Sequence, residues 1–188
     1  MRKFFVICFL HLLSTAAFGA VLERSDASTF TTSGSLLIVT TPSGAVQRIH
    51  SAHPISTGDV SFEDLNFDGY ADIKVLNSAG NVQTFYSVYL YDPRSNIYRF
   101  DSRLSKIPCV EADKNTHEVV GACFHASACE NWIERYSVDR RNRLALLSRQ
   151  GTYCNPSTGE SFSYDDRFKN GRRISSKTEQ LHSDEDRN

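Results

Sequence analysis

The sequence predicts an all-β fold, built as a meander of antiparallel hairpins. Short segments rich in β-branched and aromatic residues alternate with clusters of Pro, Gly, Asn and Asp, which is typical of strands joined by tight turns. No segment beyond the first 19 residues has apolar residues at the spacing of an amphipathic helix. A chain of 188 residues is long enough for one such domain and a short tail.

Residues 1–19 are predicted to be a secretory signal peptide. A basic start at Arg2 and Lys3 is followed by an apolar run from Phe4 to Ala17, and Ala17 and Gly19 are small residues at the positions that a signal peptidase reads. The run is shorter than the ~20 residues that a membrane-spanning helix needs. We therefore expect an exported protein with no membrane anchor after cleavage.

The predicted strands follow one another along residues 20–164, which are expected to form the domain. They are residues 35–41, 45–50, 60–62, 72–76, 86–91, 97–100, 106–111, 117–124, 132–138 and 144–148. Two of the turns are similar, because 92–96 and 139–142 each begin with Asp, continue with basic residues and end with Asn. Residues 165–188 are charged and lack apolar residues for a core, so we expect a flexible C-terminal tail there.

The cysteine count predicts two disulfides. Cys8 lies in the signal peptide, and an even number of cysteines remains in a chain that is expected to be exported. The four remaining are Cys109, Cys123, Cys129 and Cys154. Three pairings are possible, and we favour Cys123–Cys129 with Cys109–Cys154. Zinc is disfavoured because the spacings lack the C-x2-C pairs of zinc sites.

The net charge points to no nucleic acid or membrane partner. The full chain has a formal charge of −1, and loss of Arg2 and Lys3 leaves 19 basic against 22 acidic residues, a formal charge of −3. Such a nearly neutral chain gives no general electrostatic argument for binding polyanions or anionic lipids.

Residues 64–72 read D-L-N-F-D-G-Y-A-D, and this segment, the acidic loop, has the spacing of a calcium site. Side-chain oxygens occur at alternate positions, Gly occupies the sharp turn, and a backbone carbonyl is available one residue later. The expected ligands are Asp64, Asn66, Asp68, the carbonyl of Tyr70, and Asp72. The alternative is a metal-free turn rich in Asp, Asn and Gly.

The acidic loop is not an EF-hand. Val75 stands where an EF-hand has its bidentate Glu, and the segments on both sides are predicted strands rather than helices. The loop resembles the β-hairpin calcium loop of FG-GAP repeats, in which the last Asp opens the outgoing strand. We expect calcium to have a structural role there, because a catalytic role would need an open coordination position and acid–base groups nearby.

A second unusual segment, residues 121–132, is the expected partner-binding site. It contains two Cys and the single Trp of the chain, and its candidate contact residues are His125, Ser127, Glu130 and Trp132. A loop held by a disulfide loses little entropy on docking, and Trp is a favoured interface anchor. The alternative is that Trp132 and Phe124 are core residues and that the cysteines only staple the fold. Because G-x-S-x-G and H-E-x-x-H motifs are absent from the sequence, an enzyme is the less favoured class.

Two segments together resemble a family of small bacterial periplasmic proteins. They are D-L-N-F-D-G-Y-A-D-I-K-V-L, residues 64–76, and Y-S-V-Y-L-Y-D-P, residues 86–93. The family pattern has Tyr and Trp where this chain has Val88 and Tyr89, and it has a Gly- and Ser-rich hairpin where this chain has residues 123–132. Some members are immunity proteins against lysozyme-like, peptidoglycan-degrading toxins of type IV secretion systems. The resemblance implies a propeller-like fold, a periplasmic location and a hydrolase as the protein partner.

The sequence thus predicts a periplasmic immunity protein that inhibits a cell-wall hydrolase by inserting a loop into its cleft. The alternative is a calcium-stabilised module that binds glycan or the cell surface, for which Tyr86, Tyr89, Tyr91 and Tyr98 could provide a stacking face, although strand alternation places half of them in the core. A hydrolase of unknown type is the third and least favoured hypothesis.

Overall fold

The computed structural model describes residues 29–125 and 129–181. The predicted signal peptide, Ser127 and residues 182–188 lie outside these ranges. Within them, the chain forms antiparallel strands and two short 3-10 turns, Thr57–Asp59 and Leu104–Lys106. No helix in the described part of the chain is long and apolar enough to cross a membrane.

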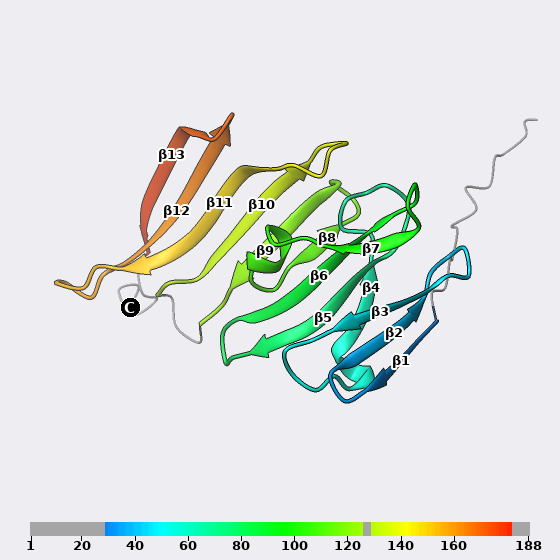
Figure 1. The fold of residues 1–188 in the computed structure, drawn as a ribbon. Coiled ribbons are helices and arrows are strands. Elements are labelled where there is room, and N and C mark those ends of the chain that lie inside the picture. Colours follow the sequence, from blue (N-terminus) through cyan, green and yellow to red (C-terminus); the bar gives the residue numbers. More distant parts are fainter. Residues whose placement is uncertain (1–28, 126–128, 182–188) are drawn as a thin grey trace, which may run out of the picture.

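The strands form three antiparallel sheets, each a meander (Figure 1). The first contains β1 (Thr29–Ser33), β2 (Leu36–Thr40) and β3 (Val46–His50). The second contains β4 (Val60–Glu63), β5 (Asp72–Ala79), β6 (Thr84–Asp92) and β7 (Ile97–Phe100). The third contains β8 (Glu111–Asp113), β9 (Glu118–Cys123), β10 (Trp132–Val138), β11 (Leu144–Cys154), β12 (Ser161–Lys169) and β13 (Arg172–Leu181). The predicted all-β meander is confirmed, and the described strands close into neither a barrel nor a propeller.

The second sheet is the middle layer of the molecule, because it contributes to both hydrophobic cores. Side chains alternate between the two faces of a strand. On β6, Tyr91 therefore joins the core shared with the first sheet, whereas Val88 and Leu90 join the core shared with the third. Leu37 of β2 and Val119 of β9 are fully buried partners in these two cores.

The two similar turns have the same backbone design. In the β6–β7 turn the Asp92 carboxylate accepts a hydrogen bond from the Arg94 N–H, at 3.0 Å. In the β10–β11 turn the Asp139 carboxylate accepts one from the Arg141 N–H, at 2.9 Å. Each turn ends in an Asn with a left-handed backbone, φ 56° and 57°, and Asn tolerates this conformation better than most residues.

The strand predicted at residues 106–111 is wrong in its position. Leu104–Lys106 is a 3-10 turn, and only Glu111–Asp113 pairs with β9. The local backbone explains the difference. Cys109 has φ 50°, and the Ala122 N–H donates to the Pro108 carbonyl, so the chain is irregular until Val110.

The flexible tail predicted from residue 165 is also wrong for residues 165–181. β12 pairs with β13 along the whole of Arg172–Leu181, and a left-handed Asn170–Gly171 pair makes the turn, with φ 51° and 73°. All ten side chains of β13 are exposed. The composition therefore indicated correctly that this segment adds nothing to a core, but a strand can form on an existing edge through backbone hydrogen bonds.

Candidate metal loop and partner-binding surface

The acidic loop joins β4 to β5 and is folded by bonds from its own backbone to its own carboxylates. The Asp64 carboxylate accepts hydrogen bonds from the N–H groups of Asp68 at 3.1 Å and Gly69 at 2.8 Å. The Asp68 carboxylate accepts one from the Tyr70 N–H at 3.0 Å. Phe67 and Gly69 have positive φ, 59° and 87°, so the chain turns tightly there.

Asp72, the first residue of β5, is fully buried and ties the acidic loop to β6. One carboxylate oxygen accepts from the Leu65 N–H and the other from the Tyr91 N–H, both at 2.9 Å. Burial raises the pKa of Asp72 to about 8, although these two bonds lower it, and the Asp68 and Asp64 carboxylates raise it further. Burial also raises the pKa of Asp68.

The acidic loop also connects the second sheet to the third. The Asn66 amide donates to the Asn142 side chain in the β10–β11 turn, at 3.2 Å. The rings of Phe67 and His117 meet edge to face with centroids 5.4 Å apart, and Leu65 is fully buried in the second core. The conformation of this loop therefore affects how the two sheets pack.

The oxygen atoms that the acidic loop offers suit calcium. In the described residues, however, its carboxylates are not arranged as a coordination shell. All the predicted side-chain ligands offer hard oxygens, and none of the ion pairs among the described residues includes Asp64, Asp68 or Asp72. However, no group of three or more His, Cys, Asp or Glu side chains in residues 29–125 and 129–181 is arranged to hold a metal ion. Calcium therefore remains a proposal.

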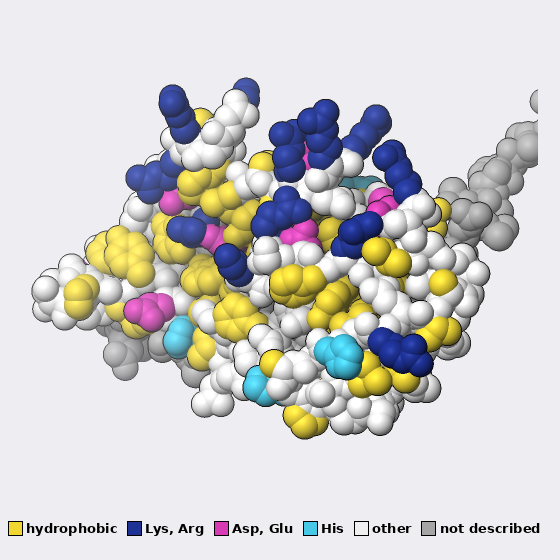
Figure 2. Space-filling view, in the orientation of Figure 1, with side chains coloured by type: hydrophobic (Ala, Val, Ile, Leu, Met, Phe, Trp, Pro, Cys, Tyr) yellow, Lys and Arg dark blue, Asp and Glu magenta, His cyan; other side chains and the backbone are white. Residues whose placement is uncertain are grey.

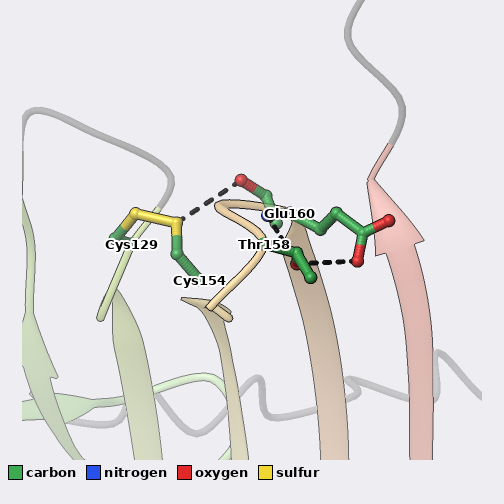
Figure 3. Close-up of a disulfide and its surroundings, with 5 residues drawn as sticks. Cys129, Cys154, Thr158 and Glu160 are labelled. Carbon is green, nitrogen blue, oxygen red and sulfur yellow. Dashed lines mark hydrogen bonds between the residues drawn. A yellow bond between two sulfur atoms is a disulfide. The ribbon is translucent and has the colours of Figure 1, made fainter. Parts of the chain in front are cut away.

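At the other end of the third sheet, a disulfide joins Cys129 to Cys154 (Figure 3), with Cα atoms 5.0 Å apart. It links the β9–β10 loop to the end of β11. The favoured pairing of Cys123 with Cys129 and Cys109 with Cys154 is therefore wrong. The cause is the hairpin register: Cys123 lies opposite Trp132 and is buried, whereas Cys129 approaches the neighbouring strand end.

Cys109 and Cys123 are free thiols in the structure, Cys123 being buried. The Cys123 sulfur accepts from the Gln83 side-chain amide at 3.2 Å, and the Cys109 sulfur accepts from the Thr84 N–H at 3.4 Å. The two thiols therefore contact consecutive residues at the start of β6, which places them near each other.

Of the predicted contact residues, His125 and Glu130 are exposed beside the disulfide, and Trp132 is half-buried. The His125 N–H donates to the Asn131 side chain, and Glu130 has φ 61°. Ser127 lies outside the described residues. Trp132 is thus neither a fully buried core residue nor a free surface residue, and it lines a groove.

This groove, the Trp132 groove, has a volume of about 430 Å³. Phe124, Trp132 and Ile133 provide apolar side chains at the β9–β10 side. Tyr164, Asp165, Lys177 and Glu179 come from β12 and β13. Phe124 is 55% exposed, so the alternative that places it in the core is wrong, and the sequence did not indicate it as a contact residue. The β12–β13 residues could not be found from the sequence, because no strand is predicted at Tyr164 and because Asp165, Lys177 and Glu179 lie in the predicted tail.

Comparison with known protein families, curated proteins and solved structures identifies no relative of this chain. No family model, curated protein or solved structure matches this chain. The two candidate sites are therefore interpreted from their own chemistry.

Half of the four candidate stacking tyrosines are core residues, as strand alternation predicts, while Tyr86 and Tyr89 are partly exposed. Tyr91 and Tyr98 are only 4% and 3% exposed and lie in the first core. A different aromatic group lies near the disulfide. Tyr153 on β11 stacks on Phe162 of β12, with centroids 5.3 Å apart and ring planes 18° apart, and Tyr153 is 40% exposed.

Proposed function

We propose that the protein is a periplasmic inhibitor that binds a lysozyme-like, peptidoglycan-degrading effector and blocks it, as an immunity protein. One observation carries this proposal: a disulfide-held loop presents an exposed Phe124 beside the Trp132 groove. A constrained loop loses little entropy when it docks. Aromatic side chains that are partly exposed beside a groove are typical anchors of protein interfaces.

The target class rests on the resemblance of residues 64–76 and 86–93 to periplasmic immunity proteins. The Cys129–Cys154 disulfide is consistent with an oxidising compartment outside the cytoplasm. A hydrolase effector delivered by a type IV secretion system is therefore the partner that we propose.

The two parts of the surface suit different parts of such a partner. Phe124 and His125 are exposed on the loop, where they could enter a substrate cleft. The Trp132 groove could accept an apolar side chain from the cleft rim, because its β9–β10 side is aromatic. On the opposite side Asp165 pairs with Arg167 and Glu179 pairs with Lys177, and these ion pairs would give the partner polar contacts at the rim of the groove.

We also propose that calcium stabilises the inhibitor through the acidic loop. Asp64, Asn66, Asp68, Asp72 and the Tyr70 carbonyl would hold the ion, which would supply positive charge to three carboxylates that have no ion pair among the described residues. Because burial raises the pKa of Asp72 to about 8, the ion would have to displace a proton from this carboxyl below that pH.

The test is an inhibition assay with purified peptidoglycan and a lysozyme-like hydrolase encoded beside the gene of this protein. Wild-type protein should block release of soluble fragments. Phe124→Ala and Trp132→Ala should each weaken inhibition by roughly 30-fold, the effect of losing an interface anchor. Phe100→Ala is the matched control, because Phe100 is equally exposed, at 56%, but lies on β7.

Two results would contradict the proposal. In the first, wild-type protein fails to inhibit the neighbouring hydrolase. In the second, folded Phe124→Ala and Trp132→Ala variants inhibit as well as wild type does. Release of fragments by this protein alone would instead support a hydrolase.

A glycan-binding module is the second candidate, and the stacked Tyr153–Phe162 pair favours it, because exposed aromatic rings stack on sugar faces. Sedimentation with insoluble peptidoglycan in the absence of any hydrolase separates the two functions. If glycan binding is the activity, Tyr153→Ala should abolish sedimentation and Phe124→Ala should not.

A further inference from the structure

Four hairpin turns gather at one edge of the molecule, opposite the disulfide. In a meander, alternate turns lie at the same end of the sheet, so the β8–β9, β10–β11 and β12–β13 turns share one edge. The β6–β7 turn adjoins them through the acidic loop, since Asp72 bonds to Tyr91 next to that turn and Asn66 bonds to Asn142 in the β10–β11 turn. We call this the turn edge.

The turn edge has exposed cations at every one of the four turns. Figure 2 shows Lys and Arg side chains along the top of the molecule, over the ends of the β10–β11 and β12–β13 hairpins. The exposed basic residues here for which the structure records no ion pair are Arg94, Lys114, Arg140, Arg141, Lys169 and Arg172.

The carboxylates of these hairpins do not cancel that charge. Three of them are paired with one further arginine each, Asp92 with Arg99, Asp139 with Arg143 and Asp166 with Arg173, whereas Asp113 and Glu118 share Arg135. The other carboxylates near the turn edge are the exposed Glu111, for which no ion pair is recorded, and those of the acidic loop, of which the buried Asp72 does not reach the surface. The exposed cations without an ion pair still outnumber Asp64, Asp68, Glu111 and the surplus carboxylate of the Asp113–Glu118 pair, although the whole chain has a formal charge of −1.

We propose that the turn edge docks on the surface of an anionic phospholipid membrane by electrostatic attraction, without insertion. Neighbouring turns of one sheet lie two strands apart, about 10 Å, so a flat array of headgroups can contact several turns at once. Among the described residues, none of the exposed large hydrophobic side chains is at the tip of one of these four turns; Ile174, which is 64% exposed, lies three residues beyond Gly171, so the tips themselves offer no apolar wedge for the acyl chains. Aromatic platforms for nucleobases, which single-stranded nucleic acid would need, are also missing from the tips in the described chain.

This docking would orient the inhibitor. The β9–β10 loop and the β11–β12 turn lie at the opposite end of the third sheet from the turn edge. A protein held by the turn edge would therefore direct Phe124 and the Trp132 groove away from the lipid surface, toward the space where a cell-wall hydrolase acts. The proposal is independent of the identity of that hydrolase.

The test is vesicle sedimentation with the mature protein at low ionic strength. Binding is expected to vesicles of phosphatidylcholine with one-third phosphatidylglycerol and not to pure phosphatidylcholine, and it should be lost at about 0.5 M salt. Each cation near an anionic surface strengthens binding by about fivefold, so Arg140→Gln with Arg141→Gln should weaken it by roughly tenfold or more. The matched control, Arg48→Gln with Lys106→Gln, removes the same charge from exposed residues elsewhere and should change binding less than twofold.

The proposal is overturned if wild type does not sediment with anionic vesicles, if it sediments equally with neutral ones, or if the control loses as much as the test variant. Tighter binding to soluble polyphosphate than to the vesicles would assign the turn edge to a polyanion and would also overturn it. Inhibition of the hydrolase should be unchanged in Arg140→Gln with Arg141→Gln, so failure here leaves the proposed function standing.

Discussion

The carboxyl group of Asp72 is held by two backbone N–H groups in a fully buried position. Its pKa of about 8 lies well above its ordinary value of 3.8. Between these two pH values the unfolded carboxyl is ionised, whereas the folded one keeps its proton. Asp72 therefore contributes stability that is fully present below about pH 4 and is lost as pH rises through about 8.

This loss of stability with rising pH can be measured by thermal denaturation. In EDTA, the melting temperature of wild type should fall between pH 4 and pH 8 by more than that of Asp72→Asn, which does not titrate. Asp72→Asn should also be less stable by about 1–3 kcal/mol at acidic pH, because one amide oxygen replaces two acceptors and a buried N–H is left facing a donor. Thermal denaturation followed by circular dichroism measures both. Parallel pH profiles for the two proteins would contradict this account.

At the scale of elements, the Cys129–Cys154 disulfide holds the β9–β10 loop against the end of β11. Replacement of both cysteines by serine should lower the free energy of unfolding by about 3 kcal/mol, as loop-closure entropy predicts for a separation of 25 residues. Urea denaturation measures this value. Inhibition should weaken as well, because the loop would no longer be held for docking. A variant with unchanged stability would argue against this disulfide.

The disulfide connectivity can be tested separately from its effect on stability. Alkylation of the unfolded but unreduced protein should label Cys109 and Cys123 and leave Cys129 and Cys154 unlabelled, as mass spectrometry of the peptides would show. Labelling of no cysteine in the mature chain would mean that a second disulfide joins the two neighbouring thiols.

The elements also show which features are local enough to be predicted from the sequence. The Asp–Asn turns were predictable because a single Asp carboxylate and one left-handed Asn define each of them. The disulfide pairing was not, because it depends on which strand end lies beside the β9–β10 loop. β13 was missed because a polar composition indicates only that a segment is not buried. This strand is held by its backbone hydrogen bonds to β12, and its side chains are all exposed.

The same distinction applies to the candidate sites. The acidic loop was predictable as a motif, since its residues are contiguous, and the loop bonds expected of such a turn are present. The Trp132 groove could not be assembled from the sequence, because it joins Phe124 to Tyr164 through three intervening strand pairings.

At the scale of the whole molecule, the acidic loop bridges the second and third sheets, so its occupancy should affect global stability. Calcium at 100 times its dissociation constant should add about 2.7 kcal/mol, which raises the melting temperature by roughly 5–10 °C. Differential scanning fluorimetry with calcium and with EDTA measures the shift. Asp68→Ala should abolish it, and a wild-type protein that is insensitive to EDTA would remove the calcium proposal.

The exposed strand β13 also has a protective consequence. It forms the outer edge of the third sheet, and an open edge invites strand addition by other chains. Its sequence, R-R-I-S-S-K-T-E-Q-L, is dominated by charged and polar residues on both faces, which discourages such pairing. A chain that ended at Lys169 would instead expose β12, whose Phe162 and Tyr164 would give neighbouring molecules an aromatic edge on which to aggregate.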